Sequence, residues 1–262
     1  MKKIVVSLFL LYSFLCFAKE TILVQGAMDM EIEHLVNALE GKTKEQFGSW
    51  TFWKGNIGKN TVIVSRTEIG LTNASAATTL GIEKYSPTII INQGTSGGHD
   101  PKLHSGDIVL AKATVNIGAV RTERKEYGIP ENPRDGIFFE DVQCLRNQKE
   151  EIIKHMKFYS DETLLKLAKN IKYTKGNLIL GVVASADQWN RELERIQFLH
   201  HKYGSSTEEM ETVAVAQVSK AFGIPFLGVR ILSNSEIHQE SFNPKTALWC
   251  QEYVLELIKN IP

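Results

Sequence analysis

The chain has 262 residues, of which 43% are hydrophobic and 23% are charged, and this suits one large globular domain with a sizeable core. Its 30 Lys and Arg residues balance 30 Asp and Glu residues. No global charge therefore argues for a nucleic acid or an anionic membrane as a partner.

The first 18 residues differ from the rest of the chain. Lys2 and Lys3 precede the apolar run IVVSLFLLYSFLCF, and Ala18 closes a small-x-small cleavage site. The run is shorter than the roughly 20 residues that a transmembrane helix needs. The sequence therefore predicts a signal peptide over residues 1–18 and a single exported domain over residues 19–262, with a retained anchor as the alternative.

Cys16 would leave with the signal peptide. A lipid on it is a weaker alternative, because Leu15 is not the small residue expected before a lipidated cysteine. Cys144 and Cys250 lie among apolar neighbours and are expected to be buried free thiols, with one disulfide as the alternative. No CxxC pattern or Cys/His cluster has metal-ligand spacing, so no metal site is expected.

Apolar runs alternate with amphipathic stretches throughout the mature chain, which predicts an α/β layered sheet. Residues 121–150 are polar and form a long excursion rather than a linker. Strands are expected at residues 21–26, 50–53, 61–65, 88–92, 107–115, 178–183 and 225–232. Helices are expected at residues 27–40, 71–85, 160–172, 205–223 and 244–259.

The stretch SSTEEMETVAVAQVSKAFG organises the chain. It is expected to be a helix that one of its first three residues caps and that Gly223 ends. Acids in a first turn complement the helix dipole, which accounts for Glu208 and Glu209 better than for Glu211. Glu211 lies at the mouth of the apolar stripe, where a carboxylate is costly unless something binds it.

The following segment, PFLGVRILSNSE, is expected to be a buried strand that brings Arg230, Ser233 and Asn234 to its carboxyl end. Ligands of open α/β sheets bind outside the carboxyl ends of the strands. Together, EEMETVAVAQV and PFLGVRILSNSE resemble the signature of the purine nucleoside phosphorylase and nucleosidase superfamily. More narrowly, they resemble the 5′-methylthioadenosine/S-adenosylhomocysteine nucleosidases.

Three further segments extend this resemblance over nearly the whole mature chain. GAMDMEIEHL is similar to the family's GAMxxE turn, NQGTSGG to its NxGSAGG loop, and SADQW to its SGDxF segment. Glycines in such a loop let the backbone approach a ligand closely, and consecutive N–H groups can accept an anion. The resemblance implies a three-layer α/β/α sandwich with a central mixed sheet, a homodimer, and neither a metal nor an organic cofactor.

The resemblance also implies hydrolysis of an N-glycosidic bond in a purine nucleoside. This reaction builds positive charge on the sugar and negative charge on the departing base, so it needs placed carboxylates and a donor to the base. Glu31 would activate water, Arg230 would steer the water and Glu31, and Asn234 would donate to purine N7. Glu211 would bind the ribose hydroxyls, and Ser233 would orient Asn234.

The remaining positions carried over from the family contact the substrate. Trp189 in place of the family's Phe keeps the surface on which the purine stacks. The family holds the purine at the positions of Ser185 and Asp187 and lines its pocket at the position of Met28. The substrate-binding residues expected from the resemblance are Met28, Thr95, Ser96, Gly97, Ser185, Asp187, Trp189, Glu209, Met210, Glu211 and Ser233.

Two departures from the family affect specificity. The nucleosidases have an aspartate where this chain has Asn234, and an amide cannot deliver a proton to N7. In place of the family's His/Asp-rich strand, this chain reads KATVNIGAVRT, which puts the preference for the 5′ substituent in doubt. Asn234 favours one alternative, a phosphorylase for 6-oxopurine nucleosides. However, Glu31 stands where phosphate would be repelled.

A third alternative is a surface binding or storage protein on a nucleosidase scaffold. Export favours it, because these nucleosides arise in the cytoplasm. A basic stripe that could bind sulfated glycans is formed by Lys166, Lys169 and Lys172, with Lys175 beyond it. The simpler interpretation of these lysines is a solvated helix face.

The signal-peptide hypothesis predicts that the mature protein begins at or near Lys19. N-terminal sequencing of protein from the native host measures this directly. Recovery of intact Met1, or of a lipid on Cys16, would refute the prediction.

Overall fold

A computed structural model describes residues 19–129 and 136–262. The signal peptide expected over residues 1–18 lies outside the described residues. Among the helices of the described chain, none has the length and apolarity needed to cross a membrane.

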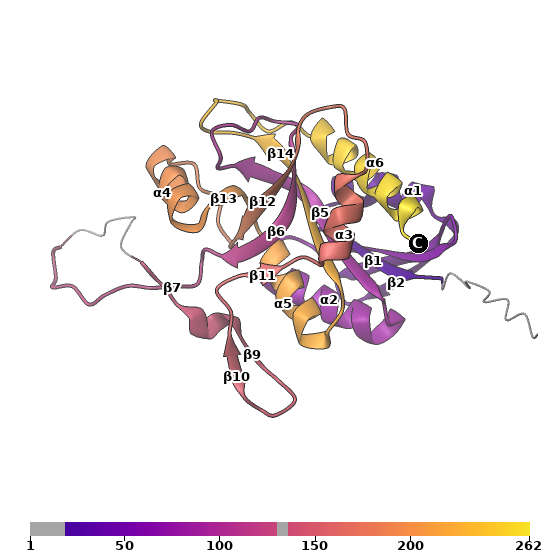
Figure 1. Cartoon of the computed structure of the whole chain (residues 1–262), viewed down its shortest axis with the longest axis horizontal. Helices are drawn as coiled ribbons and strands as arrows, with labels where there is room; N and C mark the ends of the chain where they lie inside the picture. The colour runs from indigo at the N-terminus through magenta and orange to yellow at the C-terminus, as the bar shows by residue number, and fades with distance from the viewer. Residues whose placement is uncertain (1–18, 130–135) are drawn as a thin grey trace, which may run out of the picture.

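The described chain is built on a ten-stranded mixed sheet (Figure 1), as the α/β prediction requires. The strand order is β11-β6-β12-β13-β5-β1-β4-β3-β2, and β14 pairs with both β5 and β6. The strands with parallel partners are β1 (Thr21–Gly26), β4 (Asn60–Arg66), β5 (Ile89–Gly98), β6 (Ile108–Asn116), β12 (Leu178–Ser185), β13 (Ser205–Glu209) and β14 (Phe226–Asn234). The edge strands are β2 (Glu40–Phe47), which pairs with β3 (Trp50–Ile57), and β11 (Phe158–Tyr159) at the other end.

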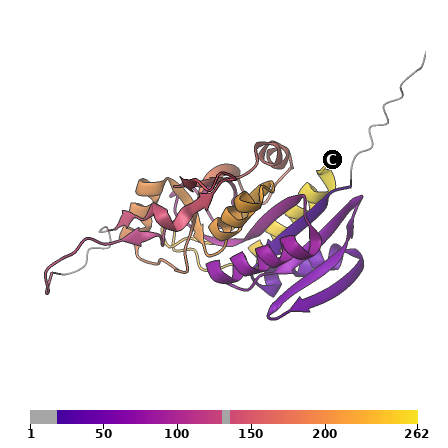
Figure 2. The same ribbon diagram turned by 90° about the horizontal axis from the view of Figure 1, so that it is seen from below.

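Helices cover both faces of this sheet (Figures 1 and 2). One face carries α1 (Asp29–Ala38), α3 (Glu162–Lys169) and α6 (Lys245–Asn260), whose apolar residues share a core with β1, β4, β5, β6 and β14. The other face carries α2 (Leu71–Tyr85) and α5 (Thr212–Phe222), which share a second core with β1, β4 and β5. A further helix, α4 (Leu193–Tyr203), packs against β6 and β12.

Continuous apolar runs explain the central strands. Ile89, Ile90 and Ile91 in β5 are all buried, because helices cover the sheet on both sides of them. The Ala-rich sequence of α2 lets the helix lie close to the sheet, and Gly81 faces Leu23 of β1 at a distance that leaves no room for a larger residue.

The prediction of a helix over residues 205–223 is wrong for the first part of this range. Residues 205–209 form strand β13, which pairs in parallel with β12 and antiparallel with β5. The helix begins only at Thr212, with Glu211 at its N-cap, and ends at Gly223 as expected. Glu208 and Glu209 therefore belong to a strand and do not complement a helix dipole. The tertiary pairing of a polar strand overrides the local capping signal.

The Gly-rich segment NQGTSGG is also not a loop. It continues β5 to Gly98 and pairs with β14 and β13, so it is extended rather than a nest, although the Thr95 N–H donates to the Glu31 carboxylate. The glycines are needed for close packing: a Cβ on Gly94 would come within 2.7 Å of both Arg230 Nη1 and Glu31 Oε1. The motif thus gives the site room for these two side chains.

The helix expected over residues 160–172 ends at Lys169, so Lys172 and Lys175 do not continue its face. Lys175 forms an ion pair with Glu252. Cys144 and Cys250 are free of a disulfide, as expected, but only Cys250 is buried, while Cys144 is half-buried.

The described residues between Val120 and Lys154 confirm the long excursion expected over residues 121–150. They carry four short strands and one turn of helix, which project away from the main sheet (Figure 1). The strands are β7 (Val120–Arg121), β8 (Ile137–Phe138), β9 (Cys144–Arg146) and β10 (Ile152–Lys154), and the turn is η1 (Glu140–Gln143). They pair as two small sheets, β7 with β8 and β9 with β10.

Candidate active site

A cavity of about 450 Å³ opens at the carboxyl ends of β1, β5 and β14, where open α/β sheets bind ligands. The sequence predicted most of its lining. The predicted residues found in its wall are Met28, Glu31, Thr95, Ser96, Gly97, Trp189, Glu209, Met210, Glu211, Ser233 and Asn234.

Sequence reasoning missed six residues of the wall. Four of them are direct neighbours of motif residues and could have been found that way: Ala27, Met30, Gln188 and Glu208. Ile69 and Phe242 carry no such signal, because each lies in irregular structure outside the motifs.

Three predicted site residues do not line the cavity. Ser185 is fully buried beneath it, and its hydroxyl donates to the Glu209 carboxylate. Asp187 is exposed and accepts a hydrogen bond from the backbone N–H of Leu71, at the start of α2. Arg230 is buried behind the cavity wall. These side chains support the site from outside its lining.

Glu31 is buried at the first turn of α1, and four donors hold its carboxylate. Oε1 accepts from the Thr95 backbone N–H at 2.7 Å and from the Thr95 hydroxyl at 2.9 Å. Oε2 accepts from the N–H groups of Ala27 and Met28 at 2.9 and 3.2 Å. A carboxylate has about four lone-pair positions, so a water molecule that reaches Glu31 must displace one of these donors.

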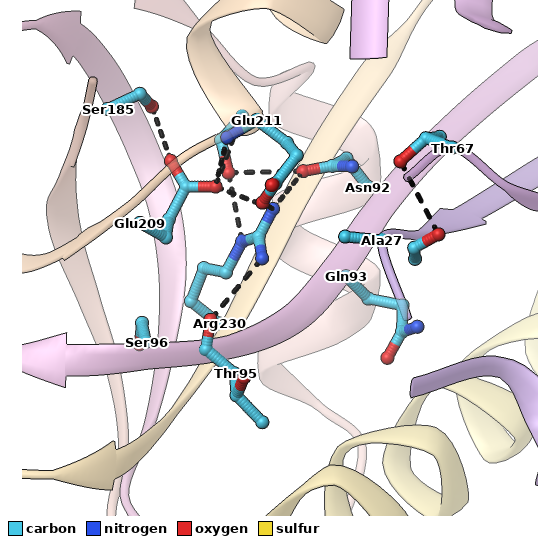
Figure 3. A network of polar contacts seen from close by, with 12 residues as sticks. Ala27, Thr67, Asn92, Gln93, Thr95, Ser96, Ser185, Glu209, Glu211 and Arg230 are labelled. Atoms are coloured by element: carbon cyan, nitrogen blue, oxygen red, sulfur yellow. Dashed lines mark hydrogen bonds and ion pairs between the residues drawn. The ribbon is translucent and has the colours of Figure 1, made fainter. Parts of the chain in front are cut away.

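Arg230 is the centre of a buried network that joins β14, β13 and β5 (Figure 3). Its Nη2 lies 2.6 Å from Glu209 Oε2 and 3.4 Å from Glu211 Oε2. Its Nε donates to the Thr212 hydroxyl, and Nη2 also donates to the side-chain oxygen of Asn92. A buried guanidinium is tolerated because these partners satisfy its charge and its donors.

The carboxylates around Arg230 change the pKa of its guanidinium. Burial lowers the pKa of its guanidinium, but the nearby carboxylates of Glu209, Glu211 and Glu31 raise it, and the net direction is upward. Arg230 therefore remains a fixed positive charge. Within the described chain it pairs with the carboxylates of Glu209 and Glu211 rather than directly with Glu31, as the family role suggested. Its other donors bind the Thr212 hydroxyl, the Thr95 carbonyl and the side-chain oxygen of Asn92.

Glu209 contributes little free acceptor capacity to the cavity. Besides Arg230 and Ser185, the backbone N–H groups of Glu211 and Thr212 donate to its Oε2, each at 2.9 Å. Its carboxylate thus ties the end of β13 to the start of α5. The expected substrate contact of Glu209 is replaced by this internal role, although the residue borders the cavity.

Glu211 is the less satisfied of the two acids. It is 4% exposed, and its Oε1 accepts from the Gly70 N–H at 3.0 Å. Burial raises the pKa of this carboxyl to about 8, because Arg230 and the Gly70 N–H, which lower it, do not offset the loss of water and the nearby charges of Glu209 and Glu31. Such a shift in a cavity is typical of a functional acid.

Asn234 ends β14 at the cavity wall, and its orientation is set by its neighbour. The Ser233 hydroxyl donates to Asn234 Oδ1 at 2.9 Å, as the sequence predicted for the pair. The amide nitrogen lies 3.5 Å from the point where a Cβ on Gly97 would stand, so it is turned toward the β5 wall of the cavity. It is available as a donor there.

Comparisons with known proteins agree with this geometry. The sequence model of the Phosphorylase superfamily matches residues 21–259. A 5′-methylthioadenosine/S-adenosylhomocysteine nucleosidase of Bacillus pumilus is 30% identical over 248 residues, which cover 91% of this chain and 98% of the relative.

Two solved structures share the fold. The crystal structure of a 5′-methylthioadenosine/S-adenosylhomocysteine nucleosidase from Neisseria meningitidis has a TM-score of 0.75 at 24% identity, covering 92% of this chain and 100% of that one. Futalosine hydrolase of Helicobacter pylori has a TM-score of 0.74 at 23% identity, covering 92% and 98%. The same fold is therefore found in proteins that carry different enzyme names.

The raised pKa of Glu211 predicts a specific pH dependence of stability. Between about pH 4.5 and 8 the folded protein keeps a proton that the unfolded chain releases, so the free energy of unfolding falls as the pH rises through this range. Glu211→Gln, which mimics the protonated acid, should remove this part of the slope. Urea unfolding at pH 5, 6.5 and 8 measures it.

Glu83→Gln, on the exposed side of α2, is the matched control and should keep the wild-type slope. An unchanged pH dependence in folded Glu211→Gln would contradict the assignment of the buried proton to Glu211.

Proposed function

Because the chain belongs to the Phosphorylase superfamily and, within it, to the 5′-methylthioadenosine/S-adenosylhomocysteine nucleosidases, we propose that it is a purine nucleoside N-ribohydrolase. Its substrates are 5′-methylthioadenosine, S-adenosylhomocysteine or related 5′-substituted adenosines, and its base product is adenine. The observation that carries this proposal is a single cavity whose wall includes the buried carboxylates of Glu31 and Glu211 and the amide of Asn234.

Glu211 is the residue proposed to hold the sugar. Ribose hydroxyls are donors, and a buried carboxylate with one backbone partner has acceptor positions left for them. Binding these donors favours the ionised acid, which then stabilises the positive charge that develops on the sugar ring. Arg230 holds Glu211 in place and keeps its own charge out of the cavity.

Glu31 is proposed as the base that takes a proton from the attacking water. Of its four donors, the Thr95 hydroxyl is the only one on a rotatable group, since the other three are backbone N–H groups. Turning this hydroxyl away exposes a lone pair of Oε1 and gives the water an acceptor on Thr95. The proton of the water then passes to Glu31 as the oxygen attacks the sugar carbon.

At the base end, Asn234 donates a hydrogen bond to purine N7 and Trp189 offers a stacking face. Asn234 cannot protonate the departing adenine, so that proton comes from water. The phosphorylase alternative would need a cation to bind phosphate. Arg230, however, pairs with Glu209 and Glu211, and Arg66 pairs with Asp29 and Glu68.

The excursion supports the proposal of a homodimer. Large apolar side chains of this segment are exposed in the described chain, and such patches mark protein interfaces. They are Val120, Tyr127, Ile129, Ile137, Phe139, Val142, Ile152 and Ile153. Export after cleavage near Ala18 is proposed from the sequence of residues 1–18 alone. The glycan-binding alternative is weaker, because α3 ends before Lys172 and Lys175 is paired with Glu252.

The proposed chemistry predicts a phosphate-independent release of adenine and a free ribosyl sugar. Glu31→Gln should lower kcat by roughly 10²–10⁴-fold, since the amide cannot accept the proton of water. Chromatography of products from a nucleoside panel, with and without phosphate, measures both. Glu33→Gln, on the exposed side of the same helix, is the matched control and should keep full activity.

A strict phosphate requirement with formation of sugar 1-phosphate would instead establish the phosphorylase. Near-normal turnover in folded Glu31→Gln would remove Glu31 from the role of base.

The amide at position 234 predicts a gain of function on adenine nucleosides. Asn234→Asp supplies a carboxyl group that can protonate N7, and a general acid contributes roughly 10²–10⁴-fold, of which we expect the low end. The carboxylate should repel O6 of a 6-oxopurine, so activity on inosine should fall. The ratio of kcat/KM for methylthioadenosine and inosine measures this change.

Asn260→Asp adds the same charge at an exposed position far along α6 and should change neither value. A lower kcat/KM on methylthioadenosine in folded Asn234→Asp would show that the cavity is built around the amide.

A further inference from the structure

A second buried pair of ionisable side chains lies beside the cavity and takes no part in the mechanism described above. His99 follows β5 and is 1% exposed, and Glu208 of β13 is 6% exposed. His99 Nε2 lies 3.1 Å from Glu208 Oε2, an ion-pair distance at which the N–H points off the hydrogen-bond direction. His99 Nδ1 is 2.8 Å from the Ser205 hydroxyl.

Glu208 also holds a segment on the other side of the cavity. Both of its oxygens are bound by Asn190: the backbone N–H donates to Oε1 at 2.8 Å, and the side-chain Nδ2 donates to Oε2 at 2.6 Å. Two parallel bonds to one carboxylate fix orientation as well as position. Asn190 directly follows Gln188 and Trp189, which line the cavity where the purine is proposed to stack.

The buried position of the Glu208 carboxylate suits it to holding Asn190. Its burial makes the contact strong, because hydrogen bonds to an ionised group in a low dielectric are little screened by water. A buried carboxylate is costly without polar partners, and besides the two donors of Asn190 the His99 ring lies 3.1 Å from Oε2. By contrast, the other tie on the same segment, Arg191 to Glu236, is largely exposed at Arg191 and contributes little.

We propose that His99 and Glu208 form a buried bracket that fixes Asn190, and through it the Gln188–Trp189 wall, in the position that receives the purine base. His99, Glu208 and Asn190 are positioning residues. They act through a wall that contacts the base in the ground state and in the transition state alike, so their loss weakens binding rather than the chemical step. This inference rests on the proposed function only for the expected changes in KM and kcat.

The test combines kinetics with a measurement of the wall itself. Glu208→Gln and Asn190→Ala should each raise KM for methylthioadenosine about tenfold, as expected for the loss of a charge-assisted hydrogen bond, and should leave kcat within about twofold. The double variant should be no worse than either single one, since both changes break the same link. Arg191→Ala is the matched control and should stay within about twofold of wild type.

Acrylamide quenching reports the position of Trp189 without any turnover. The contribution of Trp189 is the difference between each protein and its Trp189→Phe counterpart, and it should become more accessible in Glu208→Gln and Asn190→Ala but not in Arg191→Ala. Asn190 lies near the surface, so Asn190→Ala tests the bracket even where Glu208→Gln fails to fold.

Unchanged KM and Trp189 quenching in folded Asn190→Ala would overturn the bracket, as would additive effects in the double variant. A wild-type protein that hydrolyses no nucleoside would refute the proposed function instead. The quenching difference would then still decide whether the bracket fixes the wall.

Discussion

The buried guanidinium of Arg230 is the constraint on which the site depends. A charge at 1% exposure is stable only with ionised partners, and Glu209 and Glu211 provide them. These two acids are separated by one residue at the junction of β13 and α5. Arg230 therefore forces a strand end, a helix start and the core strand β14 to meet at one point.

The same charge gives Glu209 and Glu211 different roles. Glu209 receives the shorter contact to Arg230 and three further donors, the Ser185 hydroxyl and the backbone N–H groups of Glu211 and Thr212, so it serves the fold. Glu211 lies farther from Arg230 and faces the cavity with a raised pKa. One cation thus leaves one carboxylate fully satisfied and the other available to a ligand.

The sequence predicted much of the fold because most of its elements follow local rules. The Ala-rich helix α2 was expected with its observed bounds, and the apolar run at residues 88–92 was expected as a strand, although β5 continues to Gly98. β13 was missed, since SSTEE reads as a helix cap and its pairing with β12 and β5 depends on residues far away in the chain. β2 was missed too, because its sequence EGKTKEQF is polar and exposed, without the alternation that marks a half-buried strand.

In the site, too, local patterns were predictable and contacts between distant residues were not. Residues that carry a motif were predicted in the cavity wall and found there, as with Glu31, Glu211 and Asn234. The partners of those residues were not predictable, because a motif does not state what a side chain contacts. The bonds from Ser185 to Glu209 and from Asn190 to Glu208 join positions that only the folded sheet brings together.

The donors around Glu31 connect substrate binding to catalysis in the proposed mechanism. Without substrate, the four donors occupy the acceptor positions of the carboxylate, so a passing water finds no free one there. Thr95, which supplies two of them, also lines the cavity, so an incoming sugar displaces water next to the rotatable hydroxyl. Release of that hydroxyl exposes the base only when a nucleoside is present, which ties the activation of water to an occupied cavity.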